Sequence, residues 1–369
     1  FWKMNAGMGD VVFAPAYEAL RRRGVRFEFF HRVDDIVPSS DGRSIQRIDG
    51  GVQVELRDGL DVYEPLIDVK GLPCFPAEPL ADQLDLGDRM PDRFDLEMVW
   101  NDWPDARSFS LEAGRDFDVA VLAIPIGMAP YICSRLIDSN PRWAAMAGSL
   151  GTVATQAVQL WLRPDMETLG WKHASITITG FTKPFDTWSS MEHLLPVEDW
   201  PQNDRPETLG YFCNTLPTGV PPPADDLDYP KDEHQRVRRH AVEFLNANVA
   251  HYWPKAVDEN GFRWELLAGA GDADGTDRLD TQFWTANVDP SERYVQSLPG
   301  SDRYRMKTDQ SGYLNLLLAG DWIDSGLNAG CIEAAVLSGL QAGNAALGYD
   351  RYTDLLGWYP TWSLQEAET

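Results

Sequence analysis

The chain has 369 residues, with 57 acidic and 32 basic side chains and a formal net charge of −25. Hydrophobic residues make up 43% of it, which is enough to bury a core and excludes global disorder. So acidic a chain is poorly suited to nucleic-acid phosphates or an anionic membrane surface, and we expect neither as a partner. The four cysteines form no CxxC pair, which argues against a zinc site and a disulfide-stapled fold.

The first sixty residues predict a helix, a strand and a hairpin. The helix spans 14–23, with Pro15 in its first turn, and Asp10 is a candidate cap ahead of it. A strand follows over 26–37. SIQRI and VQVEL are predicted as two short strands, joined by a hairpin turn at Asp49-Gly50-Gly51. The stretch NAGMGDVV is not a phosphate-binding loop, because its third glycine is missing and no strand precedes it.

The middle of the chain mixes strand and helix signals. FDVAVLAIPIG (117–127) is a continuous apolar run and predicts a buried parallel strand. VATQAVQLWL (153–162) alternates and predicts a strand with one wet face. The segments 62–114 and 163–230 are rich in Pro and Asp and are interpreted as irregular, while 234–251 predicts an amphipathic helix. Abundant tryptophans here indicate core anchors or, alternatively, an aromatic substrate pocket.

The segment LNLLLAGDWIDSGLNAGCIEAAVLSGLQAGNAALG predicts a buried strand, a glycine-punctuated turn and a helix that begins near Gly330. Unpaired backbone N–H groups at such a helix start suit an anionic or electron-rich ligand edge. Asp321, at the end of the strand, can accept hydrogen bonds from sugar-like hydroxyls. The alternation of strands and helices indicates an α/β fold, or α+β overall.

This segment resembles the C-terminal flavin-binding signature of the flavin amine oxidase and phytoene (carotenoid) desaturase superfamily. GVRFEFFHRVDDI, FDVAVLAIPIG and FWTANVDPSERYVQSLPG resemble three further segments of that superfamily, in the same order. The resemblance implies FAD as the cofactor, and a Rossmann-like FAD-binding domain interleaved with a mixed-sheet substrate domain. It assigns cofactor-binding roles to Val33, Ala123, Pro125, Gly320, Asp321, Asn328, Ala329, Gly330 and Cys331.

Two positions depart from the amine oxidase pattern. Tyr304 falls near one position of the aromatic pair that flanks the substrate, but Cys331 holds the other. Thr155, with Gln156 beside it, stands where amine oxidases commonly carry a lysine that holds a water near flavin N5. Both departures leave a dehydrogenase or desaturase open. Tyr304, Cys331 and Thr155 are therefore the candidate catalytic positions, and nothing in the sequence indicates a metal site.

The resemblance also divides the chain into parts. The predicted FAD-binding parts are 1–68, 115–149 and 304–350, the substrate-binding domain is 150–303, and 69–114 and 351–369 are an irregular excursion and a tail. The family's G-x-G-x-x-G unit is not found in the sequence. We expect it on a cleaved upstream fragment or on a second polypeptide, so that the flavin-binding domain is incomplete at its N-terminus.

The expected reaction is hydride transfer from a C–N bond of an amine or amino-acid-like substrate to flavin N5. A C–C desaturase acting on an isoprenoid, or a non-catalytic partner subunit of a flavoprotein, remain as alternatives. A cytoplasmic location is expected, with an upstream targeting segment left open.

Overall fold

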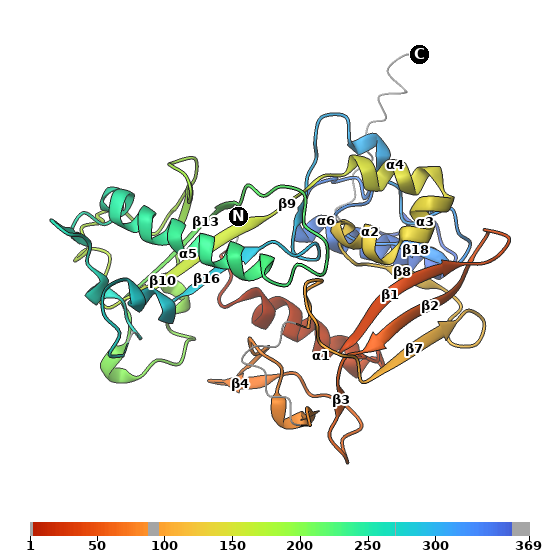
Figure 1. Ribbon diagram of the computed structural model, residues 1–369, viewed down its shortest axis with the longest axis horizontal. Helices are drawn as coiled ribbons and strands as arrows, with labels where there is room; N and C mark the ends of the chain where they lie inside the picture. The colour runs from red at the N-terminus through yellow and green to blue at the C-terminus, as the bar shows by residue number, and fades with distance from the viewer. Residues whose placement is uncertain (1–2, 88–95, 270, 356–369) are drawn as a thin grey trace. The chain divides into compact units, whose positions relative to one another are not determined.

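The computed structural model describes residues 3–87, 96–269 and 271–355. The chain divides into two compact units (Figure 1). Unit 1 draws on residues 1–29, 56–95 and 154–288, and unit 2 on 30–55, 96–153 and 289–369. This division follows contacts within the chain, so the domain roles assigned from the sequence stay predictions. Part of the predicted excursion and most of the predicted tail lie outside the described residues.

Unit 1 is built on a five-stranded antiparallel sheet in the order β11-β12-β13-β10-β16. Its strands are β10 (Thr155–Leu162), β11 (Thr177–Ile178), β12 (Thr187–Ser190), β13 (Thr208–Thr215) and β16 (Phe283–Asn287). The long helix α5 (Tyr229–Asn248) packs on this sheet, where His240 Nδ1 lies 2.8 Å from Gln156 Oε1 of β10. The predicted helix at 234–251 is confirmed, and it begins five residues earlier.

An aromatic cluster forms the core beside this sheet. Trp188 lies 5.1 Å from Tyr252 and 6.3 Å from Trp253 between ring centroids, and Phe212 packs against all three. All four rings are buried. The abundant tryptophans in the middle of the chain were interpreted as core anchors or as an aromatic substrate pocket. For Trp188 and Trp253 the first interpretation is confirmed.

The N-terminal segment of unit 1 is helical, but it starts differently from the prediction. A single π-helical turn, η1 (Gly9–Phe13), runs directly into α1 (Ala14–Arg22). The N-cap is Met8 and Asp10 lies inside the turn, so the prediction that Asp10 caps the helix was wrong. The smaller elements of this unit are β4 (Ile67–Val69), β5 (Leu72–Cys74), β6 (Leu84–Asp85), β14 (Val257–Asp258) and β15 (Gly261–Phe262), and β3 (Glu55–Leu56) lies at the boundary between the units.

Unit 2 contains a three-stranded antiparallel sheet in the order β1-β2-β7 and a two-stranded parallel sheet, β8-β18. Three short helices follow β8, and one long helix follows β18. The elements are β1 (His31–Pro38), β2 (Ile45–Val52), β7 (Arg107–Glu112), β8 (Ala120–Leu122), α2 (Ala129–Ile132), α3 (Ser134–Ser139), α4 (Pro141–Ser149), β9 (Thr152–Val153), β17 (Tyr294–Val295), β18 (Leu316–Leu318) and α6 (Ile332–Ala346).

The predicted hairpin at Asp49-Gly50-Gly51 was wrong. β2 runs straight through these residues and pairs with β1 on one side and β7 on the other. The glycines are needed for space and not for a turn. A Cβ on Gly50 would lie 2.1 Å from the Arg32 carbonyl oxygen and 2.5 Å from the Phe109 ring, and a Cβ on Gly51 would lie 2.1 Å from an Asp105 carboxylate oxygen.

Two segments interpreted as irregular contain strands. β7 lies within 62–114 and completes the sheet of β1 and β2, and β11, β12 and β13 lie within 163–230. β13 carries Gly210 and Asn214, which weaken a strand signal, and its pairing with β10 and β12 overrides that local preference. The strand at 153–162 was predicted to have one solvent-exposed face, but both faces of β10 are buried or half-buried. The reason is that β10 is the second strand from the edge of its sheet.

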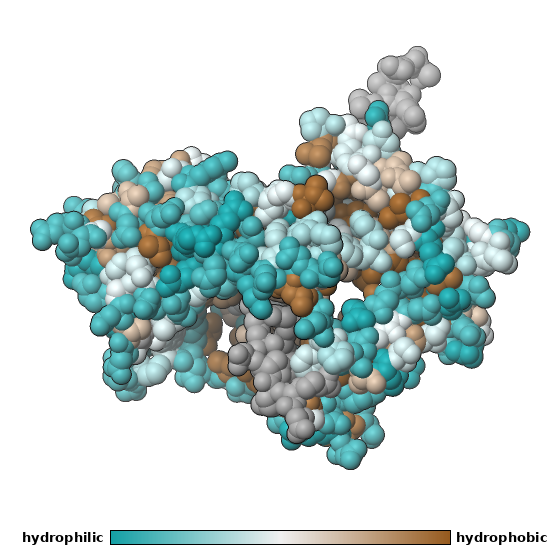
Figure 2. Space-filling model, viewed as in Figure 1, coloured by the Kyte–Doolittle hydropathy of each residue, from teal (hydrophilic) through white to brown (hydrophobic). Residues whose placement is uncertain are grey.

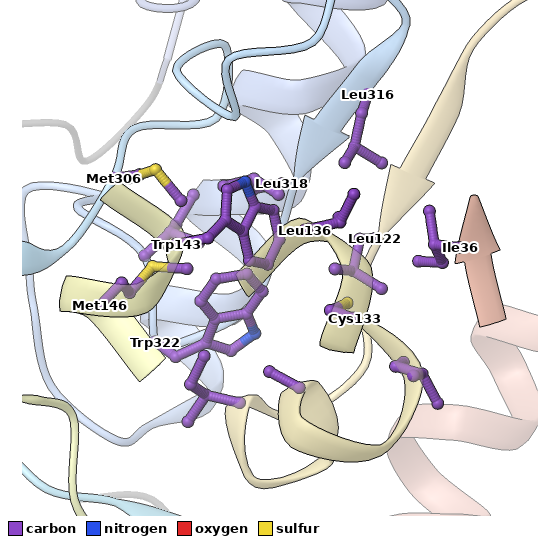
Figure 3. Close-up of a cluster of buried hydrophobic side chains, with 14 of the residues drawn as sticks. Ile36, Leu122, Cys133, Leu136, Trp143, Met146, Met306, Leu316, Leu318 and Trp322 are labelled. Atoms are coloured by element: carbon purple, nitrogen blue, oxygen red, sulfur yellow. The ribbon is translucent and has the colours of Figure 1, made fainter. Parts of the chain in front are cut away.

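The core of unit 2 lies on one side of the parallel sheet (Figure 3). Leu122 of β8 and Leu316 and Leu318 of β18 point into it, where they meet Trp143 of α4 and Trp322 from the turn after β18. α6 covers the other face of β18. The parallel strand predicted at 117–127 is confirmed only over Ala120–Leu122, and the prediction that it is buried holds for Leu122 alone, because Val121 on the opposite face is 47% exposed. The mixture of helix and sheet agrees with an α/β class.

The surface of the face shown in Figure 2 is mostly hydrophilic, with small separate hydrophobic patches. Within the described ranges, every helix is too short or too polar to cross a lipid bilayer.

The crowding at Gly50 predicts a stability effect. Gly50→Ala would force a methyl group against backbone and ring, and we expect it to lower the free energy of unfolding by about 1–3 kcal/mol, as overpacking does. Urea denaturation followed by circular dichroism measures this. Gly148→Ala in α4 is the matched control, because a Cβ there meets nothing within 4 Å. Equal stability of the two variants would contradict the steric account of Gly50.

Candidate flavin site

The parallel pairing of β8 and β18 places two strand ends side by side. Leu318 is opposite Leu122, and the Ala319 N–H donates to the Leu122 carbonyl at 2.9 Å. Residues that follow these strands therefore leave the sheet at the same edge, which is where α/β sheets bind ligands. The structure brings together four residues singled out from the sequence: Ala123, Pro125, Gly320 and Asp321.

The other edge of β18 is occupied by the chain segment that precedes it. The Leu318 N–H donates to the Thr308 carbonyl at 2.9 Å, and Thr308 Oγ1 donates to the Leu318 carbonyl at 2.7 Å. Ser311 Oγ donates to the Leu316 carbonyl at 2.5 Å. These bonds hold the strand rigidly, so its end is a fixed platform for the turn that follows.

Gly320 turns the chain out of the sheet. Its φ of 133° is in a region that side chains disfavour, and a Cβ would lie 2.4 Å from Trp322 Nε1. The Gly320 N–H donates to Ser338 Oγ of α6 at 2.7 Å, and Ser338 in turn donates to the Ala335 carbonyl. The turn and the helix are thus joined by a buried hydroxyl, and the chain approaches α6 closely.

Asp321 is half-buried beside a buried arginine. Arg305 Nη1 donates to the backbone carbonyl of Asp321 at 2.7 Å, and within the part of the chain described no side chain donates to the Asp321 carboxylate. Burial raises the pKa of Asp321, and the charge of Arg305 opposes that rise. Burial also lowers the pKa of Arg305. The carboxylate therefore keeps acceptor oxygens for hydroxyl groups of a ligand.

A hydrogen-bond chain extends from Arg305 to the loop before α6. Arg305 Nη2 donates to Ser297 Oγ at 3.2 Å, and Ser297 Oγ donates to the Asn328 carbonyl at 2.7 Å. The sequence did not indicate Arg305 or Ser297 as site residues. Burial is the property that distinguishes Arg305, whose side chain is 0% exposed, and no residue pattern shows burial directly.

The loop from Asn328 to Cys331 ends at the N-terminus of α6. Asn328 has a φ of 49°, and its buried Oδ1 has no hydrogen-bond partner among the described residues. Cys331 is the N-cap and makes no side-chain cap bond. Free N–H groups at the start of this helix, a buried amide oxygen and the adjacent Asp321 carboxylate form a donor and acceptor set that suits a flavin.

The remaining predicted residues lie in four places. Val33 is in β1 opposite Gly50 and packs on the core of unit 2. Tyr304 ends a short 3-10 helix, and its hydroxyl accepts from Arg303 Nη2 at 2.8 Å. Thr155 begins β10 of unit 1, where its Oγ1 accepts from Asn287 Nδ2 at 2.9 Å. Ala329 and Gly330 are exposed in the loop before α6. The catalytic roles of Tyr304, Cys331 and Thr155 stay predictions.

The raised pKa of Asp321 gives a pH-dependent prediction. A carboxyl group that is harder to ionise in the folded state costs stability as the pH rises through its raised pKa. We expect Asp321→Asn to be more stable than wild type at about pH 7, and the difference to shrink as the pH falls towards about 4. Thermal melts across that range measure it.

Asp138→Asn, on the exposed surface of α3, is the control and should show no such trend. An Asp321→Asn variant less stable than wild type at neutral pH would contradict the prediction, since it would show that attraction to Arg305 outweighs the effect of burial.

Comparisons with known proteins bear on the family of the chain. The family model described as flavin containing amine oxidoreductase matches residues 102–347. An oxidoreductase from Methanosarcina mazei of known crystal structure has a TM-score of 0.40 and 10% identity, covering 84% of this chain and 47% of its own. This chain thus spans about half the length of that protein. No curated protein matches. The family model covers well over half of the sequence, so the chain belongs to the flavin-containing amine oxidoreductase family, as predicted, and FAD is the cofactor of that family.

Proposed function

We propose that this chain forms part of an FAD-dependent oxidoreductase that oxidises a C–N bond of an amine or amino-acid-like substrate. The observation that carries the proposal is the convergence of Gly320, Asp321 and the start of α6 at the carboxyl ends of β8 and β18. When bound, FAD supplies the hydride acceptor. The protein's own residues bind and orient it, so no side-chain nucleophile is required.

Each element of the site has a separate task in this proposal. Gly320 lets the backbone approach closely, and the Asp321 carboxylate accepts hydrogen bonds from cofactor hydroxyls. Arg305 fixes the backbone of Asp321 and keeps positive charge beside it. The N-terminus of α6 stabilises negative charge on the ligand edge that it faces, with an effect of about 0.3–1 kcal/mol or more when partly buried.

We also propose that a further segment, which carries the G-x-G-x-x-G loop, completes the flavin site. Two features support it. α6 is apolar on the side away from β18, where Ile332, Val336, Leu340 and Leu347 are 37–73% exposed. In the described part of the chain only β18 pairs with β8, and Val121 of β8 is 47% exposed. Parallel sheets and helices that are apolar all round are normally covered, so a strand followed by a helix fits here.

This proposal predicts that the isolated chain retains little FAD. Co-expression with the coding sequence upstream of Phe1, or with a separate polypeptide bearing the loop, should restore a flavin spectrum in the purified protein. Val336→Glu should lower the flavin content of that complex, because it places a charge in the apolar contact. Ser134→Glu, at an exposed position of α3, should leave it unchanged.

Strong flavin retention by the isolated chain would contradict the need for a second segment, while it would leave the oxidoreductase proposal intact.

The substrate class is tested by anaerobic reduction of the flavin-loaded protein. We expect bleaching of the flavin bands by a member of a panel of amines and amino acids, and none by isoprenoids. The family supports an amine substrate over an isoprenoid, because it is one of amine oxidoreductases. Bleaching by an isoprenoid alone would favour the desaturase alternative. A complex that stays colourless would instead favour a non-catalytic subunit.

A further inference from the structure

One buried oxygen of the candidate flavin site takes no part in holding the protein together. Asn328 Oδ1 is buried, and no described residue donates a hydrogen bond to it. The backbone carbonyl of the same residue is bonded, because it accepts from Ser297 Oγ at 2.7 Å. Ser297 has a single hydroxyl proton, so it cannot serve the side-chain oxygen as well. A buried acceptor without a donor is costly, and a ligand that supplies an N–H group relieves that cost.

The backbone conformation of Asn328 does not account for this oxygen. Its φ of 49° is in the left-handed region, which Asn and Gly adopt more readily than other residues. Gly would meet that requirement without burying a polar group. The side-chain amide therefore adds what the turn itself does not need. It is an acceptor on a backbone that Ser297 and the buried Arg305 hold in place.

The residues that follow Asn328 offer donors beside this acceptor. Cys331 is the N-cap of α6 and makes no side-chain cap bond, so the N–H groups of the first helical turn are left for a ligand. The loop also passes next to the Asp321 carboxylate, because a Cβ on Gly330 would lie 3.7 Å from Asp321 Oδ2. The segment 328–334 thus presents one neutral acceptor followed by a row of donors.

The pyrimidine edge of an isoalloxazine ring has the complementary order of groups. It carries the acceptors N1 and C2=O, then the single donor N3–H, and then the acceptor C4=O. The N–H groups of a helix start satisfy acceptors, but they cannot serve N3–H, which needs an oxygen. In the loop before α6, Asn328 Oδ1 is a buried oxygen that still lacks a donor.

We propose that Asn328 Oδ1 accepts a hydrogen bond from N3–H of the flavin, and that Asn328 thereby selects a cofactor whose N3 carries a proton. This inference rests on the proposed function, because it needs a flavin at this site, and it goes beyond that function in pairing one atom of the chain with one atom of the cofactor. A site that hydrogen-bonds an N–H group rejects the analogue that lacks it, because its own buried polar group then stays unpaired.

FAD methylated at N3 tests the proposal, because the methyl group replaces the donated proton. The flavin-loaded complex with the loop-bearing segment is stripped of its cofactor and titrated with FAD or with 3-methyl-FAD, and binding is followed by flavin fluorescence. We expect the wild type to bind FAD at least about tenfold more tightly than 3-methyl-FAD. Asn328→Gly keeps the left-handed backbone and should lose most of that preference. Asn260→Gly, at an exposed turn position between β14 and β15, should keep it.

The ¹⁵N resonance of N3 in labelled FAD reports the hydrogen bond directly. Relative to wild type, it should move upfield in Asn328→Gly, which lacks the acceptor. It should move downfield in Asn328→Asp, whose charged oxygen is a stronger acceptor. The two variants have opposite expected shifts, so Asn328→Asp decides the question if Asn328→Gly fails to fold by circular dichroism.

An N3 resonance that is the same in the variants as in the wild type would overturn the assignment of Asn328. A preference for FAD that Asn328→Gly keeps in full would also overturn it. Both results would leave the oxidoreductase proposal intact, since FAD would still bind. A complex that binds no FAD would instead overturn the proposed function, and this inference with it.

Discussion

The pairing of three residues of β18 with three of β8 is the interaction on which the candidate flavin site depends. It aligns two segments almost two hundred residues apart in the sequence, so that both leave the sheet at one edge. The core of unit 2 fills one face of this pair and α6 covers β18 on the other. Moving either strand by one residue would turn its core leucines towards the opposite face, which makes the register strongly specified.

A network of buried hydrogen bonds also holds the residues of the site in place. Ser338 joins α6 to the turn at Gly320, and Arg305 joins that turn to the loop at Asn328. Both side chains are buried, so their hydrogen bonds do not compete with solvent. The polar groups left for a ligand, the Asp321 carboxylate and the buried Asn328 oxygen, are held from behind by this network.

The sequence predicted best where one local signal decided the structure. The apolar run ahead of Gly320 and the small-residue helix after Gly330 were both recognised, because each carries its own pattern. Gly50 and Gly51 were mistaken for a turn, since their reason lies in Phe109 and Asp105, which are distant in the sequence. β13 was missed because its stability comes from pairing with β10 and β12, and Arg305 was missed because its burial arises only from the tertiary fold.

The segment that occupies the outer edge of β18 also decides at which edge of the parallel sheet a further strand can pair. Thr308 and Ser311 already use the carbonyl groups that a new strand beside β18 would need. A strand can therefore be added only next to β8, and it must meet the sheet from that side. Pairing of two copies through the edge of β18 is blocked by the same hydrogen bonds, so this edge is protected against non-specific association.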